Sequence, residues 1–264
     1  PRSMAAEAAL RLASDALEGR EAGFRGGRIA GEYIVSNLKT MGIEPLFESY
    51  YQPFEAYNKE RQKKGRFQVH PDSIAKLKQG VHQKLSMNNI LGKIEGKNPN
   101  EYVIIGAHYD HLGFDPMLDG DRVYNGADDN ASGVSAVLQV AKAFLATGVQ
   151  PERTVIFAFW DGEEKGLLGS KYFVQTFLEM DKMKGYLNYD MIGRNKDESK
   201  PMHVVYFYTE AHPVFGDWLK NDIKKYGLNL TPDYRPWDKP VGGSDNASFA
   251  LLDIPVIWYH TDGH

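Results

Sequence analysis

Short hydrophobic runs alternate with longer amphipathic segments from Tyr102 to the end of the chain. The runs are rich in β-branched and aromatic residues, and between them apolar residues recur at helical spacing. This alternation is typical of βα units around a mostly parallel sheet. It predicts strands at Tyr102–Gly106, Thr154–Trp160, Tyr186–Tyr189, His203–Tyr208 and Pro255–Tyr259.

Three helices are predicted from apolar residues that recur every three or four positions. The first runs from Gly27 to Gly42, because the second glycine provides a typical helix end. The second and third are carried by the apolar residues of Val134–Leu145 and Phe215–Tyr226.

The chain before Tyr102 is less regular. Asn89 leads into a further predicted strand that ends near Gly96. Segment Pro53–Ser86 is polar, and its apolar residues follow neither the helical nor the strand period. We therefore expect an irregular loop insertion there. Together with the loop Pro232–Gly243, this insertion is expected to contribute to the wall of a pocket.

Composition narrows the possible chemistry. The chain has 264 residues, of which 42% are hydrophobic and 25% charged, as in ordinary globular domains. The net charge is −4 and no basic block dominates, which disfavours nucleic acid as a partner. No apolar run approaches the roughly 18 residues of a membrane span. The sequence has no cysteine, so any metal must be held by His, Asp and Glu.

Polar residues follow the predicted strands at the point where each strand ends. In an open α/β sheet, ligands collect outside the carboxyl ends of the strands. We therefore expect these residues to meet at one edge of the sheet. They are His108, Asp110 and His111 after the first strand, Glu163 and Glu164 after the second, Asp190 after the third and His260 after the last, with Asp128 and Asp129 in the loop 126–133.

Taken alone, each of these residues has an ordinary structural explanation. The pair Glu163–Glu164 suits the first turn of a helix. Asp190 has Arg194 and Lys184 as nearby candidates for an ion pair, and His260 is explained as a partly buried histidine. Their occurrence together at the ends of successive strands favours a functional site.

A metal site explains this combination best. His108 and Asp110 are two residues apart on an extended segment, so a carboxylate stands behind the imidazole and fixes its tautomer. Several carboxylates around one pocket need cations, and a set of nitrogen and oxygen ligands suits Zn, Mn or Co. We therefore expect a metal site, with two ions. A serine hydrolase and a nucleotide enzyme are minor alternatives, because neither the nucleophile elbow nor a phosphate-binding loop occurs.

The chain resembles the co-catalytic zinc aminopeptidases of peptidase clan MH, a family of leucyl aminopeptidase-like exopeptidases. The resemblance covers the chain from about Gly19 to its end. Its five motifs occur in the family's order, and they are Gly106–Asp110, Gly126–Gly133, Phe159–Glu164, Asn188–Gly193 and Ser244–Phe249.

The resemblance implies specific roles for six residues. The implied zinc ligands are His108 and Asp190 for one ion, Glu164 for the other, and Asp129 as the bridge between them. Glu163 would act as the general base and Asp110 would orient His108. The family's peptide bond after the bridging Asp is typically cis, so we expect a cis bond at Asp129–Asn130.

The sequence departs from the family pattern near its end. His260 matches the family's last zinc ligand locally, but the usual spacing from Ser244 places that ligand a few positions beyond His264. We therefore expect a truncated C-terminus and a weakened second zinc site. Asn246 stands where relatives often have His. The start at Pro1 suggests that a segment was removed upstream.

These observations predict a zinc-dependent exopeptidase, most simply an aminopeptidase that acts through a metal-bound hydroxide. Residues 1–264 would form one α/β domain, with three α/β/α layers around a central mixed, mostly parallel sheet. The expected substrate is a peptide with a free N-terminus, and the family suggests a secreted or periplasmic location. The alternatives are an enzyme like glutaminyl cyclase with a single zinc, and a non-catalytic binding domain of the same fold.

Overall fold

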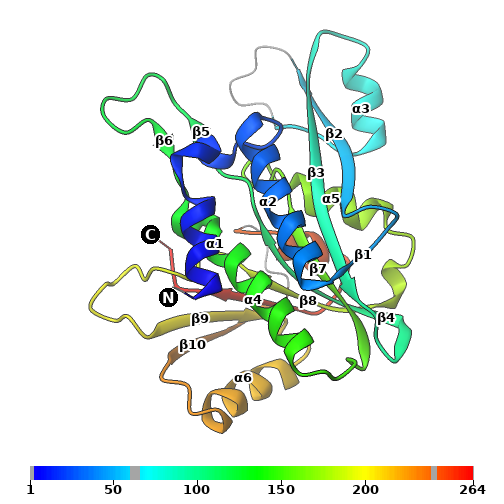
Figure 1. Cartoon of the computed structure of the whole chain (residues 1–264). Helices are drawn as coiled ribbons and strands as arrows, with labels where there is room; N and C mark the ends of the chain where they lie inside the picture. The colour runs from blue at the N-terminus through cyan, green and yellow to red at the C-terminus, as the bar shows by residue number, and fades with distance from the viewer. Residues whose placement is uncertain (1–2, 60–65, 239–242, 264) are drawn as a thin grey trace.

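The computed structural model describes residues 3–59, 66–238 and 243–263. A mixed sheet of nine strands forms the centre of the molecule (Figure 1). The strands run in the order β1-β3-β7-β4-β8-β11-β9-β10, and β2 pairs with β3 outside this path. Their bounds are β1 Glu44–Pro45, β2 Tyr51–Lys59, β3 His82–Ile94, β4 Asn98–His108, β7 Arg153–Trp160, β8 Met183–Tyr189, β9 His203–Tyr208, β10 Thr231–Pro236 and β11 Val256–His260. The short strands β5 (Gly113–Phe114) and β6 (Val123–Tyr124) form a separate ribbon.

The four central strands β7, β4, β8 and β11 are mutually parallel. On either side the direction reverses, because β3 is antiparallel to β7 and β9 is antiparallel to β11. The predicted mixed, mostly parallel α/β architecture is therefore confirmed for the centre of the sheet. Its main consequence is that four carboxyl strand ends point to the same edge.

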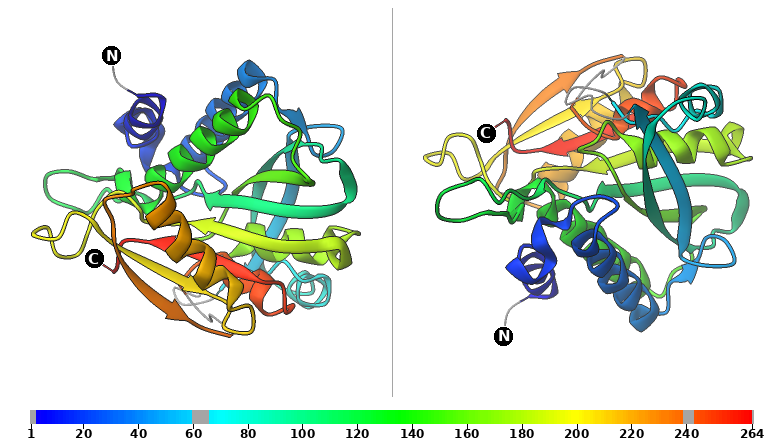
Figure 2. Two further views of the ribbon diagram at one scale, coloured as in Figure 1. Left: turned by 90° about the horizontal axis from the view of Figure 1, so that it is seen from below. Right: turned by 90° about the horizontal axis from the view of Figure 1, so that it is seen from above.

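Helices cover both faces of this sheet (Figure 2). Helices α2 and α4 pack on the face that carries Ile105 and Phe157. Helices α5 and α7 pack on the opposite face, which carries Ile104 and Ile156. The alternation follows from the two-residue period of a strand. The helices are α1 Met4–Leu12, α2 Arg25–Met41, α3 Pro71–Leu77, α4 Gly133–Ala146, α5 Leu168–Thr176, α6 Val214–Lys225 and α7 Asn246–Ala250, with shorter helical turns η1 Asp15–Arg20, η2 Ala127–Ser132 and η3 Met180–Lys182.

The predicted helices and strands are present with small shifts at their ends. Helix α2 ends at Met41, and Gly42 follows in the left-handed conformation with φ of 79°. A glycine adopts this conformation without a steric penalty, which explains why the helix ends there. Strand β4 is longer than predicted and extends to His108.

The prediction of an irregular loop over residues 53–86 is wrong for the described residues. They form most of β2, the helix α3 and the start of β3, and β2 pairs with β3 from Tyr51–Ile90 to Lys59–His82. Alternate residues of β2 such as Phe54 and Ala56 are buried against Met87. Residues 60–65 lie outside the described part, and an insertion relative to other proteins stays a prediction.

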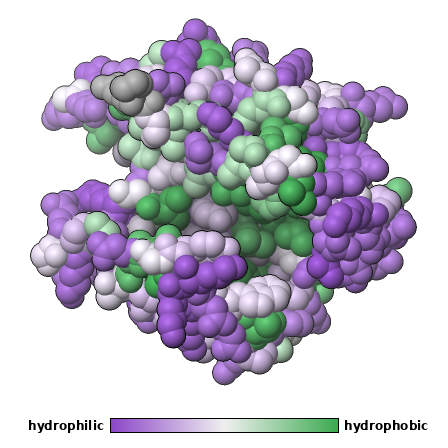
Figure 3. Space-filling view, turned by 60° about the horizontal axis from the view of Figure 1, so that its bottom comes forward, coloured by the Kyte–Doolittle hydropathy of each residue, from purple (hydrophilic) through white to green (hydrophobic). Residues whose placement is uncertain are grey.

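The surface is mainly hydrophilic in the view of Figure 3, with hydrophobic residues gathered in a hollow at the centre of that face. Within residues 3–59, 66–238 and 243–263, no helix has the length and apolar character needed to cross a membrane. The candidate site residues lie at the edge of the sheet where the parallel strands end.

Candidate metal centre

The parallel strands deliver the candidate residues to one edge of the sheet. His108 is the last residue of β4, Asp190 directly follows β8, and Glu163 lies in the loop after β7. Asp129 comes from η2, the turn that leads into α4. Because β7, β4 and β8 are neighbours with the same direction, their carboxyl ends are close in space.

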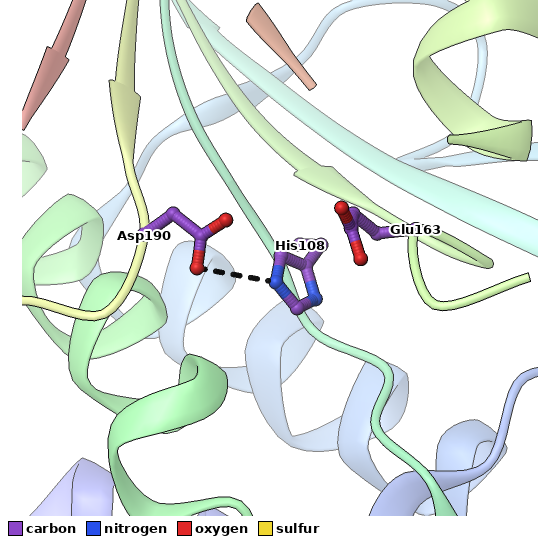
Figure 4. Close-up of side chains that lie close together, drawn as sticks. All are labelled: His108, Glu163 and Asp190. Atoms are coloured by element: carbon purple, nitrogen blue, oxygen red, sulfur yellow. Dashed lines mark ion pairs between the residues drawn. The ribbon is translucent and has the colours of Figure 1, made fainter. Parts of the chain in front are cut away.

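One cluster joins His108, Glu163 and Asp190. One ligand atom from each residue lies within 4.8 Å of the others. His108 Nε2 is 3.4 Å from Asp190 Oδ1, and Glu163 lies on the other side of the imidazole (Figure 4). His108 and Asp190 are buried, whereas Glu163 is partly exposed toward the pocket. This cluster therefore combines an imidazole and two carboxylates at the pocket floor.

A second cluster joins His111, Asp129 and Glu164 by the same distance criterion. Asp129 lies between the two groups, because its Oδ1 is 3.2 Å from His108 Nε2 and its Oδ2 is 3.9 Å from His111 Nδ1. The two oxygens of one carboxylate thus face the two clusters. This arrangement is the one a bridging ligand needs.

The distances around His108 fit a zinc ion. With zinc bonds of about 2.0 Å, two ligand atoms of a tetrahedral site are about 3.3 Å apart. His108 Nε2 is 3.2 Å from Asp129 Oδ1 and 3.4 Å from Asp190 Oδ1. Asp190 Oδ1 is also buried without a hydrogen-bond partner among the described residues, as expected for an atom that binds a cation.

His111 relates differently to its cluster. Its Nδ1 lies 2.7 Å from Glu164 Oε1, which is a hydrogen-bond distance and is shorter than the spacing of two atoms that share a zinc ion. The His111 ring packs against Gly126, where a Cβ atom would come within 2.5 Å of it. His111 is therefore held in place and positions the Glu164 carboxylate.

Asp110 connects the two strand ends that form the site. Its carboxylate is fully buried, and its Oδ1 lies 3.6 Å from His108 Nδ1. The same carboxylate accepts the backbone N–H of Glu163 at 3.0 Å and that of Glu164 at 3.3 Å. His108 Nδ1 lies closer to the backbone oxygen of Asp110, at 3.2 Å. Asp110 thus holds the imidazole through its backbone oxygen and the loop of Glu163 and Glu164 through its side chain.

Arg20 holds the loop that carries Asp129. Its side chain is 1% exposed, and burial lowers its pKa to about 10. It donates hydrogen bonds to the backbone carbonyls of Leu12, Tyr109, Asn125, Gly126 and Asp129. A planar guanidinium can reach several acceptors at once, so Arg20 ties the N-terminal region to the site.

The pKa shifts indicate concentrated negative charge. Burial alone would lower the pKa of His108, but the carboxylates of Asp190 and Glu163 raise it well above its usual range. Burial raises the pKa of Glu163 well above its usual range, against the charge of His108, and the Asp245 carboxylate raises it further. Divalent cations relieve such repulsion between carboxylates.

The clusters open into a pocket of about 700 Å³. Its wall includes Arg66 and Phe67 from the segment 53–86, and Gly243 from the loop 232–243. Both segments were expected to contribute to the wall, although residues 239–242 lie outside the described part. Cationic side chains of Lys165 and Lys171 complete a wall of mixed charge.

Sequence reasoning placed most of these residues correctly at one edge. Asp190 pairs with neither Arg194 nor Lys184, whose ionic partners are other acidic residues.

His260 lies outside both clusters, and its Nδ1 is 2.8 Å from the backbone oxygen of Asp190. His264 lies outside the described residues. The peptide bond Asp129–Asn130 is cis, as the resemblance implied.

The role of His111 was missed. It belongs to the motif after β4, but nothing in the local sequence distinguishes a histidine that contacts Glu164 from a solvated one. The pairing crosses 53 positions of the chain. Only the three-dimensional arrangement of β4 and β7 reveals it.

Residues 89–264 match the sequence model of a family described as peptidase family M28. Over 170 residues the chain is 34% identical to leupeptin-inactivating enzyme 1 of Streptomyces exfoliatus, a match that covers 64% of this chain and 34% of that protein. It is 38% identical over 115 residues to an aminopeptidase of Pseudomonas aeruginosa, covering 43% of this chain and 19% of the relative. The chain thus spans about a third or less of these relatives' lengths.

Solved structures share the fold. A zinc aminopeptidase from Bacillus subtilis superimposes with a TM-score of 0.69 at 16% identity, covering 100% of this chain and 88% of that one. Glutaminyl cyclase of Porphyromonas gingivalis superimposes with a TM-score of 0.59 at 18% identity, covering 96% and 80%. At these identities the likeness concerns the arrangement of the chain.

Proposed function

Because this chain belongs to peptidase family M28, we propose that it is a zinc-dependent exopeptidase, and specifically an aminopeptidase that removes N-terminal residues from peptides. The observation that carries the proposal is the pair of clusters that share Asp129. His108 and Asp190 on one side of Asp129, and Glu164 on the other, suit two divalent ions, while His111 positions Glu164.

In this proposal, His108 and Asp190 hold one zinc ion, Glu164 holds the other, and Asp129 bridges them. Zinc, when bound, supplies a Lewis acid that makes water more acidic and polarises a carbonyl group. The remaining steps depend on side chains of this chain. Asp110 orients His108, and His111 orients Glu164 through the hydrogen bond between their side chains.

Glu163 is the proposed general base. It lines the pocket beside His108, and its backbone is fixed by Asp110. In the reaction it takes a proton from the attacking water and gives that proton to the leaving amine. A neighbouring residue of the same loop, Glu164, holds the metal, so base and ligand keep a constant separation.

Four carboxylates line the acidic part of the pocket, and they are those of Asp129, Glu163, Glu164 and Asp190. Three of these carboxylates, those of Asp129, Glu164 and Asp190, would be neutralised by zinc, so their charge alone does not select a free amine. Cleavage at the N-terminus rather than within a chain is therefore tested with the N-acetylated substrates below.

The alternatives make different predictions about metal. An enzyme like glutaminyl cyclase would use a single zinc ion and would cyclise the N-terminal glutamine of a peptide. A non-catalytic binding domain would retain the fold and hydrolyse nothing. The second cluster and the presence of Glu163 favour two ions and hydrolysis.

Two further expectations belong to this proposal. Residues 1–264 would act as one exopeptidase domain, with the segment 53–86 inserted to form part of the pocket wall. A secreted or periplasmic location stays a prediction.

The decisive experiment measures zinc per chain together with hydrolysis of a panel of aminoacyl p-nitroanilides and N-acetylated controls. We expect two zinc ions per chain, and activity that a chelator removes and added zinc restores. Blocking the N-terminus of the substrate should abolish cleavage. One ion with cyclisation of N-terminal glutamine, or no turnover after zinc is restored, would contradict the proposal.

A further inference from the structure

The pocket that contains the acidic clusters is also lined by cationic side chains. Arg66, Lys165 and Lys171 line the same pocket as His108 and Asp190. Lys165 is compensated, because its Nζ lies 2.8 Å from Glu21 Oε1. The other two cations need a separate explanation.

Lys171 and Arg66 form no ion pair with any carboxylate of residues 3–59, 66–238 and 243–263. The one hydrogen bond of the Lys171 ammonium goes to the backbone oxygen of Gly166, at 2.9 Å. An ammonium carries three protons, so this contact leaves donors for another group.

Hydrogen bonds link the Lys171 ammonium to the loop of Glu163 and Glu164. Lys171 lies in the first turn of α5, directly after the loop of Glu163 and Glu164. The backbone N–H of Gly166, whose oxygen accepts from Lys171, donates to the backbone oxygen of Glu163 at 2.8 Å. The ammonium is therefore tied to the loop that carries the proposed base.

The two cations also lie near each other. Burial lowers the pKa of Lys171, and the positive charge of Arg66 lowers it further. Both side chains also line a smaller adjoining cavity of about 190 Å³, so they stand where the two cavities meet. The Asp245 carboxylate acts in the opposite direction and raises the pKa of Lys171. Arg66 is exposed and Lys171 is partly exposed, so both cationic groups are accessible to an anion that enters the pocket.

We propose that Lys171 and Arg66 form a subsite that binds a carboxylate of the peptide substrate. The inference rests on the proposed peptidase function and adds a substrate class to it. A peptide offers a carboxylate as the side chain of an N-terminal Glu or Asp, or as the C-terminus of a short peptide. In both cases the amine faces the acidic clusters and the carboxylate faces the cations.

The test compares matched substrate pairs in which only the carboxylate differs. Glutamyl and glutaminyl p-nitroanilide test the side chain, and leucyl-glycine and leucyl-glycinamide test the C-terminus. In the unaltered zinc-loaded protein, the carboxylate member of at least one pair should have the higher kcat/KM. The pair that shows the preference identifies the source of the carboxylate.

The variants remove or keep the charge. Lys171→Gln and Arg66→Gln should each reduce the preference about tenfold or more, through KM, because a charge-assisted hydrogen bond is lost. Lys171→Arg should restore most of it. Lys142→Gln changes an exposed lysine of α4 that is remote from the pocket lining, so it should leave the preference unchanged.

Two results would overturn the subsite. One is an unaltered protein that prefers neither carboxylate substrate, and the other is a preference that survives both glutamine variants. Circular dichroism and zinc content of each variant verify its fold.

Failure of the peptidase proposal would be visible separately, as the absence of hydrolysis of every substrate. The same peptide pairs are then titrated calorimetrically into the protein. The subsite is supported if the carboxylate member of a pair binds more tightly and if this difference in affinity disappears in Lys171→Gln. Equal binding of both members refutes it.

Discussion

Glu163 and Glu164 are adjacent in the chain, yet their side chains join different clusters. Glu163 lies with His108 and Asp190, and Glu164 lies with His111 and Asp129. Both residues lie in the loop after β7, and the Asp110 carboxylate accepts a hydrogen bond from the backbone N–H of each. One dipeptide can therefore supply a proton acceptor and a metal ligand at the same time.

The first prediction concerns Glu163→Gln. The amide keeps the shape of the side chain but cannot accept the proton, so kcat should fall by about 10²–10⁴-fold. Zinc content should remain that of the unaltered protein, because Glu163 is not a proposed ligand. Steady-state kinetics and elemental analysis of the same preparation measure both quantities.

A matched control is Glu55→Gln. Glu55 is an exposed residue of β2 that forms an ion pair with Lys84 of β3. It should alter neither kcat nor zinc content. If Glu163→Gln loses zinc in proportion to activity, Glu163 acts as a ligand and its assignment as base is wrong.

A second prediction at this scale concerns Asp245, which is fully buried. Burial raises its pKa to about 7, against about 3.9 in an unfolded chain. A raised carboxyl pKa stabilises the folded state at low pH, and this contribution is lost as pH rises from about 4 through 7. The ionised carboxylate is thus unfavourable in the fold at pH 8.

Asp245→Asn removes this titration. In chelator-treated protein, its stability relative to the unaltered chain should increase between pH 4 and pH 8, by about 4 kcal/mol. Urea unfolding at a series of pH values measures the difference. A difference that stays constant over this range would show that Asp245 does not titrate there.

At the scale of elements, the strands that support the site were the easiest to predict. The central parallel strands are covered on both faces, so they are continuous runs of apolar residues such as Val155–Trp160. Strand β2 and the part of β3 before Asn89 were missed, because one face of this pair is solvated and polar residues such as Glu55 and Lys84 alternate with buried ones. The composition of this segment resembles that of a loop, although it forms strands.

The turn η2 allows a third prediction, Gly126→Ala. Gly126 has φ of 57°, and a Cβ there would lie 2.2 Å from the backbone oxygen of Asp129 and 2.5 Å from the His111 ring. The substitution therefore strains the backbone and displaces residues of the second cluster. We expect a loss of stability of about 3 kcal/mol or more, with reduced zinc content.

Gly148→Ala is the matched control, because Gly148 has φ of 63° and no atom within 4 Å of the added Cβ. It carries the same backbone strain without the collision, so its cost should be about 1 kcal/mol with full zinc content. Urea unfolding and metal analysis compare the two. Equal losses in both variants would show that backbone strain alone explains the effect at Gly126.

At the scale of the whole molecule, sequence patterns predicted which residues gather at the sheet edge but not how they pair. The order of βα units fixes the edge, so His108, Glu163 and Asp190 could be expected together. The contact of His111 with Glu164 depends on side-chain directions that no local pattern encodes. The same holds for Lys171 and Arg66, which come from α5 and from the chain after β2.

The fourth prediction is a lower melting temperature after metal removal. Ions that bind the folded chain alone stabilise it by mass action, so chelation should lower Tm by on the order of 5 °C or more. Added zinc should restore it. Differential scanning calorimetry measures the shift, and an unchanged Tm would mean that the clusters hold no tightly bound ion.

The proposed ligands come from separate segments of the chain between His108 and Asp190. These segments lie next to one another only when β7, β4 and β8 are paired. Pairing of distant parallel strands is a slow part of folding, because long loops must close before contacts form. Zinc then has no complete site on a nascent or partly folded chain. Zinc uptake at the proposed site therefore follows the pairing of β7, β4 and β8, so the order of folding and metal binding is set by the topology of the sheet.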